Sequence, residues 1–123
     1  MTNDDFNELQ SKTAQIRDTA LSIFDLETLY SRLKESQKKL ELEISTAVVN
    51  EKDEAGKKKF SNAEQRQAEV EKLLVSNKIY QRDEMKLLDL YLKIGKGKIE
   101  LQYLKDILEN ERLFFNSGDK NGN

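Results

Sequence analysis

Apolar residues recur along two long stretches of the chain, at intervals that alternate between three and four residues. This spacing puts them on one face of an α-helix and is typical of a coiled-coil seam. It predicts one helix over residues 4–52 and a second over residues 62–115. One short step beside Ile23 interrupts the first seam and predicts a local change in supercoiling. That seam comprises Phe6, Leu9, Thr13, Ile16, Ala20, Ile23, Leu26, Tyr30, Leu33, Gln37, Leu40, Ile44 and Ala47.

The second seam repeats every seven residues from Leu73. Within it, Gly95 and Gly97 lie close together, and each glycine costs up to ~1 kcal/mol in a helix interior. The pair predicts a kink near Gly95, with a break or a continuous helix as the alternatives. The repeating positions are Leu73, Tyr80, Leu87, Ile94, Leu101, Leu108 and Phe115, and the intervening ones are Asn77, Glu84, Tyr91 and Lys98.

Residues 53–61 separate the two helices. Gly56 suits the left-handed backbone that ends a helix, and Ser61 with Glu64 resembles a capping box at the next start. A connection this short makes the helices antiparallel neighbours. We therefore expect an all-α protein, a long antiparallel helical hairpin of one domain (residues 1–123). In this register Gly95 lies near Thr19 and Ala20.

The ends of the chain carry weaker signals. Asn3 or Asp4 could cap the first helix, whose early acids suit the positive end of the helix dipole. Residues 116–123 contain no apolar side chain, and we expect a disordered tail there. The acidic stretch Met1–Asp5 lacks the apolar run of a signal peptide, so we expect a cytoplasmic protein.

Composition supports long amphipathic helices rather than a compact globule. Charged residues make up 36% of the chain, hydrophobic residues make up 37%, and proline is absent. The periodic Leu and Ile positions and a net charge of only −2 argue against disorder. Residues 1–56 carry a net charge of −5 and residues 57–123 carry +3, which favours pairing of the two arms.

Candidate chemistry is sparse. The chain has no histidine and no cysteine, which removes the commonest general base, the thiol nucleophile and the usual zinc ligands. Neighbouring acids such as Glu41 and Glu43 point to different helix faces and do not converge. We expect no enzyme activity, no cofactor and no metal. No apolar stretch reaches membrane-spanning length, so we expect no membrane partner.

The apolar faces are wider than a two-helix seam requires. The excess indicates a further neighbour, which is either a third segment of the same chain, a second protomer or another protein. The simplest arrangement is two hairpins in a four-helix bundle. We predict a structural or adaptor protein that acts through coiled-coil contacts, as a homo-oligomer (a dimer is favoured) or with another helical protein. The candidate interaction surface comprises Leu21, Phe24, Leu29, Leu88 and Leu92.

The tip offers an alternative function. Lys57, Lys58 and Lys59 beside Phe60 could contact nucleic-acid phosphates and a base, as in an accessory protein of recombination or replication. A solvated turn with Phe60 folded over the helix ends is the favoured interpretation. A second alternative is a holdase-like chaperone that grips apolar segments between helix tips, although the lysines at the tip argue against it.

Two short motifs carry a resemblance. Gly56-Lys57-Lys58-Lys59-Phe60-Ser61-Asn62, followed by Arg66, Ala68 and Glu69, is similar to a pattern in small bacterial and phage-encoded helical proteins. The stretch Ile99-Glu100-Leu101-Gln102-Tyr103-Leu104 resembles their closing helix. The resemblance implies a phage or mobile-element origin, near recombination or replication functions, and transfers no catalytic residue.

Overall fold

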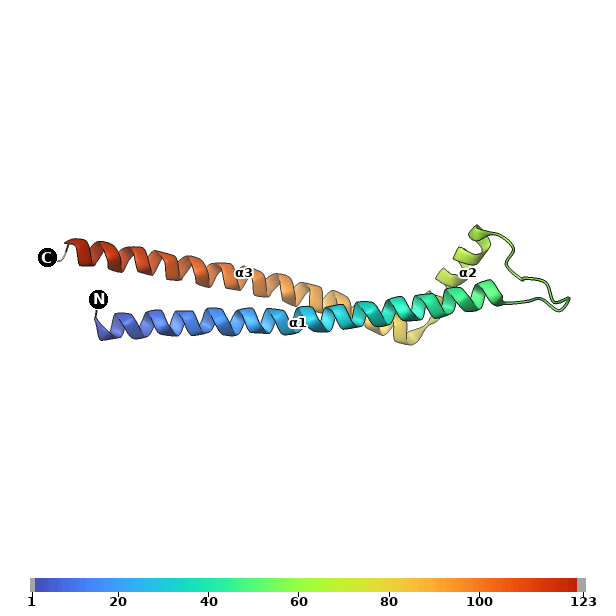
Figure 1. Ribbon diagram of the computed structural model, residues 1–123, viewed down its shortest axis with the longest axis horizontal. Helices are drawn as coiled ribbons and strands as arrows, with labels where there is room; N and C mark the ends of the chain where they lie inside the picture. Colours follow the sequence, from blue (N-terminus) through green and yellow to red (C-terminus); the bar gives the residue numbers. More distant parts are fainter. Residues whose placement is uncertain (1, 122–123) are drawn as a thin grey trace. The chain divides into compact units, whose positions relative to one another are not determined.

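The computed structural model describes residues 2–121, with side chains to residue 117, and over that range the protein is all-α. It contains α1 (Asn3–Asn50), α2 (Ala63–Ser76) and α3 (Lys78–Asn121) (Figure 1). The chain divides into two compact units. The first combines Met1–Thr28 with Tyr91–Asn123, and the second is Leu29–Leu90. The predicted all-α class is confirmed.

Each unit pairs a segment of α1 with a segment of α3. In the second unit Gln37 donates to Glu84, and Tyr80 donates to Glu41. From Gln37 to Glu41 the position on α1 moves forward along the chain, while the contacted residue on α3 moves back from Glu84 to Tyr80. The two helices are therefore antiparallel. In the first unit the Cα of Gly97 lies against Ile23.

The seam on α1 is more regular than the sequence suggested. A series of buried and half-buried positions runs from Ile16 to Ile44 in alternating steps of three and four residues, so the predicted interruption is wrong. Thr28 and Glu41 are half-buried beside this series. Thr13, Ala20 and Ala47 are exposed, and Lys12, Thr19 and Val48 lie further inside. A residue is buried in the seam because of its angular position around the helix, whether or not its side chain is hydrophobic. From Ile16 the seam comprises Ile16, Thr19, Ile23, Leu26, Tyr30, Leu33, Gln37, Leu40 and Ile44.

The seven-residue repeat on α3 is confirmed from Tyr80 to Phe115, but its intervening positions are wrong. They follow three residues after each repeat, whereas the sequence analysis placed Glu84, Tyr91 and Lys98 four residues after. Both spacings satisfy a heptad, and the observed one brings two more leucines into the seam. The intervening positions are Asp83, Leu90, Gly97, Leu104 and Glu111.

The second arm breaks at Asn77, and the predicted helix over residues 62–115 is therefore two helices. The Asn77 amide donates to Leu74 O at the end of α2, and its Oδ1 accepts from Tyr80 N at the start of α3. One residue thus caps both helices. By contrast, α3 is continuous through Gly95 and Gly97, so neither glycine breaks the helix.

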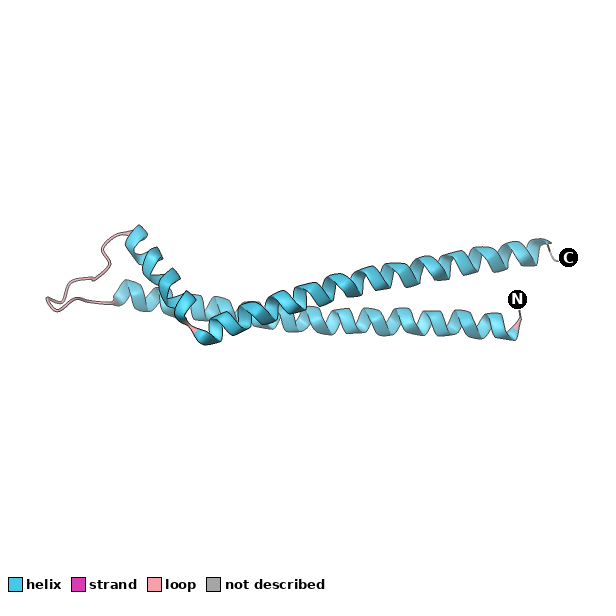
Figure 2. Ribbon diagram, turned by 180° about the vertical axis from the view of Figure 1, so that it is seen from behind, coloured by secondary structure: helices cyan, strands magenta, loops and turns pink. Residues whose placement is uncertain are grey.

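Within the second unit, α2 runs obliquely to α1 (Figures 1 and 2) and contains no buried residue. Because α2 is oblique, its 14 residues advance along α1 by less than 14 residues of a parallel-lying helix would. This detour shifts the register, so Gly97 lies against Ile23 instead of Gly95 lying near Thr19 and Ala20.

The helix ends also differ from the expectations. Thr2 caps α1 in place of Asn3 or Asp4: Asp5 N donates to Thr2 Oγ1 (3.1 Å) and Thr2 N donates to Asp5 Oδ2 (2.9 Å). These hydrogen bonds, from the backbone first, lower the pKa of Asp5. Asn62, not Ser61, caps α2 through Gln65 N. At the other end, α3 extends to Asn121, past the start of the expected tail at residue 116, and residues 122–123 lie outside the described residues.

Candidate interaction surfaces

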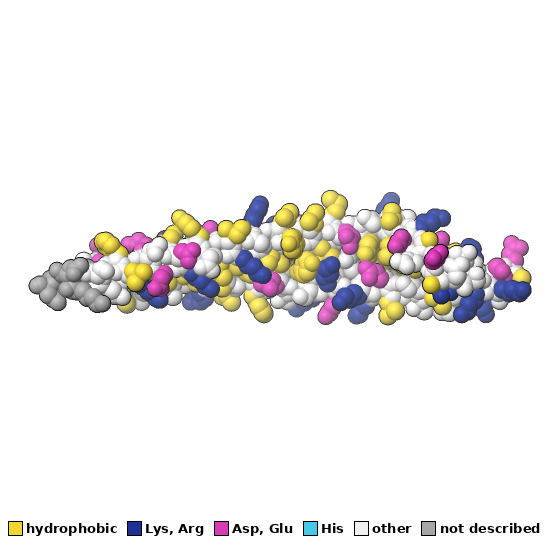
Figure 3. All heavy atoms as spheres, turned by 90° about the horizontal axis from the view of Figure 1, so that it is seen from above, with side chains coloured by type: hydrophobic (Ala, Val, Ile, Leu, Met, Phe, Trp, Pro, Cys, Tyr) yellow, Lys and Arg dark blue, Asp and Glu magenta, His cyan; other side chains and the backbone are white. Residues whose placement is uncertain are grey.

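All five candidate surface residues are exposed. Figure 3 shows hydrophobic side chains at the surface, interspersed with charged ones. The exposed fractions run from 47% to 66%. The five belong to different units and helices: the first unit contains Leu21, Phe24 and Leu92, and the second contains Leu29 and Leu88.

On α1, Leu21 and Phe24 are one helical turn apart and both lie off the seam. Phe24 has 66% of its surface exposed. Neither side chain is needed by the hairpin seam. They form an apolar spot on the outer side of α1.

On α3, the apolar face is longer than the sequence analysis recognised. Met85 and Ile99 are 75% and 73% exposed and lie seven residues on either side of Leu92. This spacing puts all three on one side of the helix. The signal was present in the sequence as a second seven-residue repeat, offset from the buried one.

The tip is an ordered loop. The carboxylate of Asp53 accepts hydrogen bonds from Ala55 N and Lys57 N, and Gly56 adopts a left-handed φ of 79°. Lys52 and Lys58 form an isolated antiparallel bridge. The loop geometry thus comes from an Asx-type turn and one glycine.

The charges of the tip are partly neutralised. Lys59 pairs with Glu51 at 3.2 Å, and its ammonium lies 5.5 Å from the ring of Phe60, which is half-buried. Residues 51–60 contain four lysines and three acids. A net charge of +1 offers little of the counterion release that drives binding to nucleic acid.

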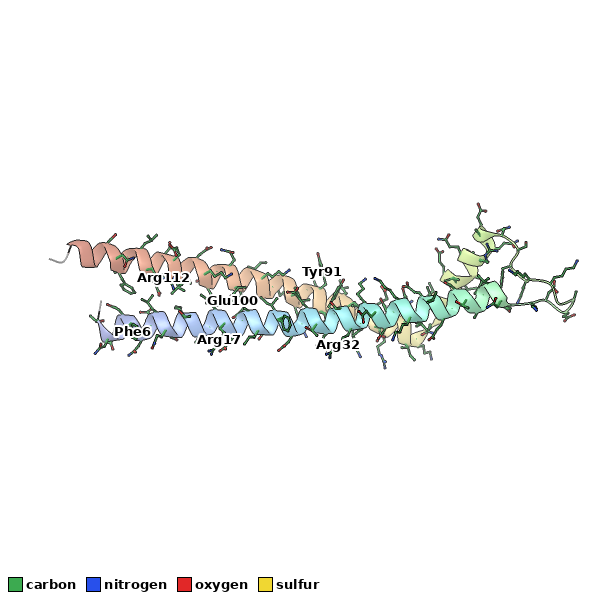
Figure 4. All side chains as sticks on the ribbon, viewed as in Figure 1. Phe6, Arg17, Arg32, Tyr91, Glu100 and Arg112 are labelled. Atoms are coloured by element: carbon green, nitrogen blue, oxygen red, sulfur yellow. The ribbon has the colours of Figure 1, made fainter. Side chains whose placement is uncertain are left out.

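A shallow groove lies between the two helices of the first unit. Figure 4 shows Phe6 and Arg17 on α1 and Arg112 on α3, all of which line it. Arg17 is 3.4 Å from Asp18, and the other lining residues are divided between apolar side chains (Phe6, Leu9 and Ala14) and polar or charged ones (Gln10, Thr13 and Arg112).

A polar layer marks the second unit. Gln37 is buried, with 4% of its surface exposed, and its Nε2 donates to Glu84 at 3.2 Å. Tyr80 Oη donates to Glu41 at 2.8 Å. A shift of one residue in either helix would leave a buried amide without this partner, so the layer helps to fix the register.

Tyr80 has a raised pKa of about 12, against an ordinary value of 10.0. Burial is the largest cause, followed by the hydrogen bond to Glu41 and the negative charges of Glu41 and Glu84. Because the pKa is higher in the folded protein, the resulting stability is complete below pH 10 and is lost as the pH rises through 12.

We therefore expect the Tyr80 phenol to ionise near pH 12. Ultraviolet titration of the wild type minus that of Tyr80→Phe isolates this single group. Glu41→Gln should move the step toward pH 10, because it removes a negative charge and the carboxylate acceptor. A difference step already at pH 10 in the wild type would contradict the prediction.

No metal-binding group of three or more acidic side chains occurs in the described part of the chain. Among residues 2–121, no helix combines the length and apolar character needed to cross a membrane.

Comparisons with known proteins give no assignment. No family model, curated protein or solved structure matches this chain. The similarity to small bacterial and phage-encoded helical proteins therefore stays a hypothesis, and the argument for function depends on the surfaces described above.

Proposed function

We propose that this protein is a non-enzymatic structural or adaptor module that associates with other copies of itself through the outer faces of its helices. The observation that supports this most is the exposure of large apolar side chains that the hairpin seam does not use. Phe24 and Leu92, with 66% and 53% of their surfaces exposed, are on different helices of the first unit. A stable helix–helix contact requires apolar surface of this kind.

The chemistry of the chain supports the same class. A protein without histidine or cysteine has few means of acid–base or nucleophilic catalysis. The buried polar contacts in the second unit join α1 to α3, and their role is to fix the register of the two helices rather than to perform chemistry. The outer apolar positions have no comparable role within the chain.

Phe24→Asp is expected to lower the average mass in solution, measured by light scattering over a range of protein concentrations. The substitution puts a charge where the proposal requires apolar contact, which costs several kcal/mol when the carboxylate is desolvated. Helicity by circular dichroism should be unchanged, because Phe24 is off the seam.

Ser22→Asp is the matched control, since it adds the same charge to the same stretch of α1 at an exposed polar position. Its mass should equal that of the wild type. A wild type that stays at the monomer mass of 14.3 kDa at every concentration would contradict self-association. Equal masses for Phe24→Asp and the wild type would exclude this face of α1.

A further inference from the structure

The two glycines of α3 face different environments. A Cβ on Gly97 would come within 2.8 Å of Ile23 Cγ1, so the absence of a side chain at Gly97 leaves the space that Ile23 occupies. A Cβ on Gly95 would meet nothing within 4 Å. Gly95 weakens the helix by up to ~1 kcal/mol, and no contact within the hairpin requires it.

Gly95 lies within a second apolar stripe on α3. The stripe alternates between three and four residues, as the buried seam does, but it is exposed. Because α3 is one uninterrupted helix, its periodicity alone puts these residues on one face. The stripe comprises Met85, Leu88, Leu92, Gly95 and Ile99, whose four large side chains are 53–75% exposed.

We propose that this stripe binds the same stripe of a second copy, with the two α3 helices antiparallel and Leu92 of each copy seated at Gly95 of the other. This inference rests on the self-association proposed above and names the surface that α3 contributes to it; the outer face of α1 that contains Phe24 is a separate contact surface. The contact repeats the one between Ile23 and Gly97, with a large side chain over a glycine. The same register puts Leu88 opposite Ile99 of the second copy.

The charges beside the stripe favour this register. Lys96 and Lys98 follow the centre, while Glu84 and Asp89 precede it. Antiparallel pairing therefore brings Asp89 beside Lys96 of the second copy, and Glu84 beside Lys105. Asp89 already interacts within its own chain, and Glu84 accepts from Gln37, but each carboxylate has two oxygens and can accept further hydrogen bonds.

Other arrangements place like charges together. A shift of one helix by seven residues in one direction would bring Asp89 opposite Asp89 of the second copy. A shift in the other direction would bring Lys96 opposite Lys96. Parallel pairing would bring Glu84 near Asp89 of the second copy. Like charges across a helix pair are destabilising, so the flanks select one orientation and one register.

Disulfide cross-linking can test the register directly, because the natural chain contains no cysteine. Chains with Leu88→Cys are mixed with differently tagged chains with Ile99→Cys, and oxidised as full-length protein. We expect a disulfide between the two kinds of chain. Neither kind should cross-link to itself, because eleven residues of helix separate the identical positions by about 16 Å, beyond the reach of a disulfide.

Gly95→Leu, added to both chains, is expected to abolish this cross-link because it fills the space that Leu92 of the other copy requires. The substitution removes a helix-weakening glycine, so loss of folding would not explain the result. Leu113→Cys, at a position 57% exposed elsewhere on α3, serves as the control and should not cross-link to Leu88→Cys.

Cross-linking of identical positions would indicate parallel helices and overturn the proposal. If no disulfide forms and the wild-type mass exceeds 14.3 kDa, association uses another face, so the α3 pairing fails while the proposed function stands. A wild type that is monomeric throughout would overturn both.

Discussion

Leu104→Ala is expected to lower the free energy of unfolding by about 2–3 kcal/mol, toward the lower end of the range for buried leucines because a helix pair encloses the cavity incompletely. Leu104 is 6% exposed and lies in the α3 seam of the first unit. The substitution removes buried methyl groups and leaves a space that the α1 side chains fill only in part. Urea unfolding followed by circular dichroism at a fixed protein concentration measures the effect.

Leu113→Ala is the matched control, with the same substitution on the same helix. Leu113 is 57% exposed, and its loss should change the free energy of unfolding by no more than about 0.5 kcal/mol. Equal losses for the two variants would mean that α3 packs by a different face from the one described.

Gly97→Ala should destabilise the protein by roughly 1–2 kcal/mol, although alanine is the better helix former. The added methyl group would lie 2.8 Å from Ile23 Cγ1, and a β-branched side chain next to its own backbone has little freedom to move away. The overpacking cost therefore exceeds the gain of up to ~1 kcal/mol in helix propensity.

Gly95→Ala, two residues earlier, should instead raise the stability of the monomeric hairpin by about 0.5–1 kcal/mol, since within one chain its methyl group meets nothing. The measurement is made at a protein concentration at which light scattering gives the monomer mass. A double-mutant cycle with Ile23→Ala supplies the further check. Because Ile23→Ala removes the atoms that clash, Gly97→Ala should be less damaging, or even stabilising, in its presence. Equal effects for the two glycine substitutions would show that the contact with Ile23 is absent.

The helical class was predictable because a spacing of three and four residues holds over most of the chain. Which of two neighbours belongs in a seam was harder to predict. Thr19 and Ala20 are similar in hydrophobic character, and the choice between them follows from the phase of the whole helix. On α3 the seven-residue repeat from Tyr80 was predicted correctly. The second seam position of each heptad could lie either three or four residues after the first, and only packing against α1 distinguishes the two spacings.

The break at Asn77 shows the limit of periodicity. Asparagine is a strong capping residue, and the signal was visible, but a seven-residue repeat passing through Asn77 favoured a continuous helix. The five candidate surface residues are exposed, as a contact outside the hairpin requires, and Met85 and Ile99, which are also exposed, were missed. With Leu92 they form a seven-residue repeat that is offset from the buried one, and this periodicity distinguishes them from isolated apolar residues beside the seam.

The antiparallel arrangement also determines how far along the chain each contact must reach. Glu41 and Tyr80 are 39 residues apart, Gln37 and Glu84 are 47 apart, and Ile23 and Gly97 are 74 apart. Once the first of these contacts forms, the second requires the chain to close eight further residues, and the third follows as the pairs of seam residues between them form one after another. Since loop-closure entropy rises slowly with each such step, we infer that folding proceeds like a zipper from the second unit to the first. Contacts made late in such a process mainly affect the rate of unfolding, so the contact between Ile23 and Gly97 would set how long the folded state lasts more than how fast it forms.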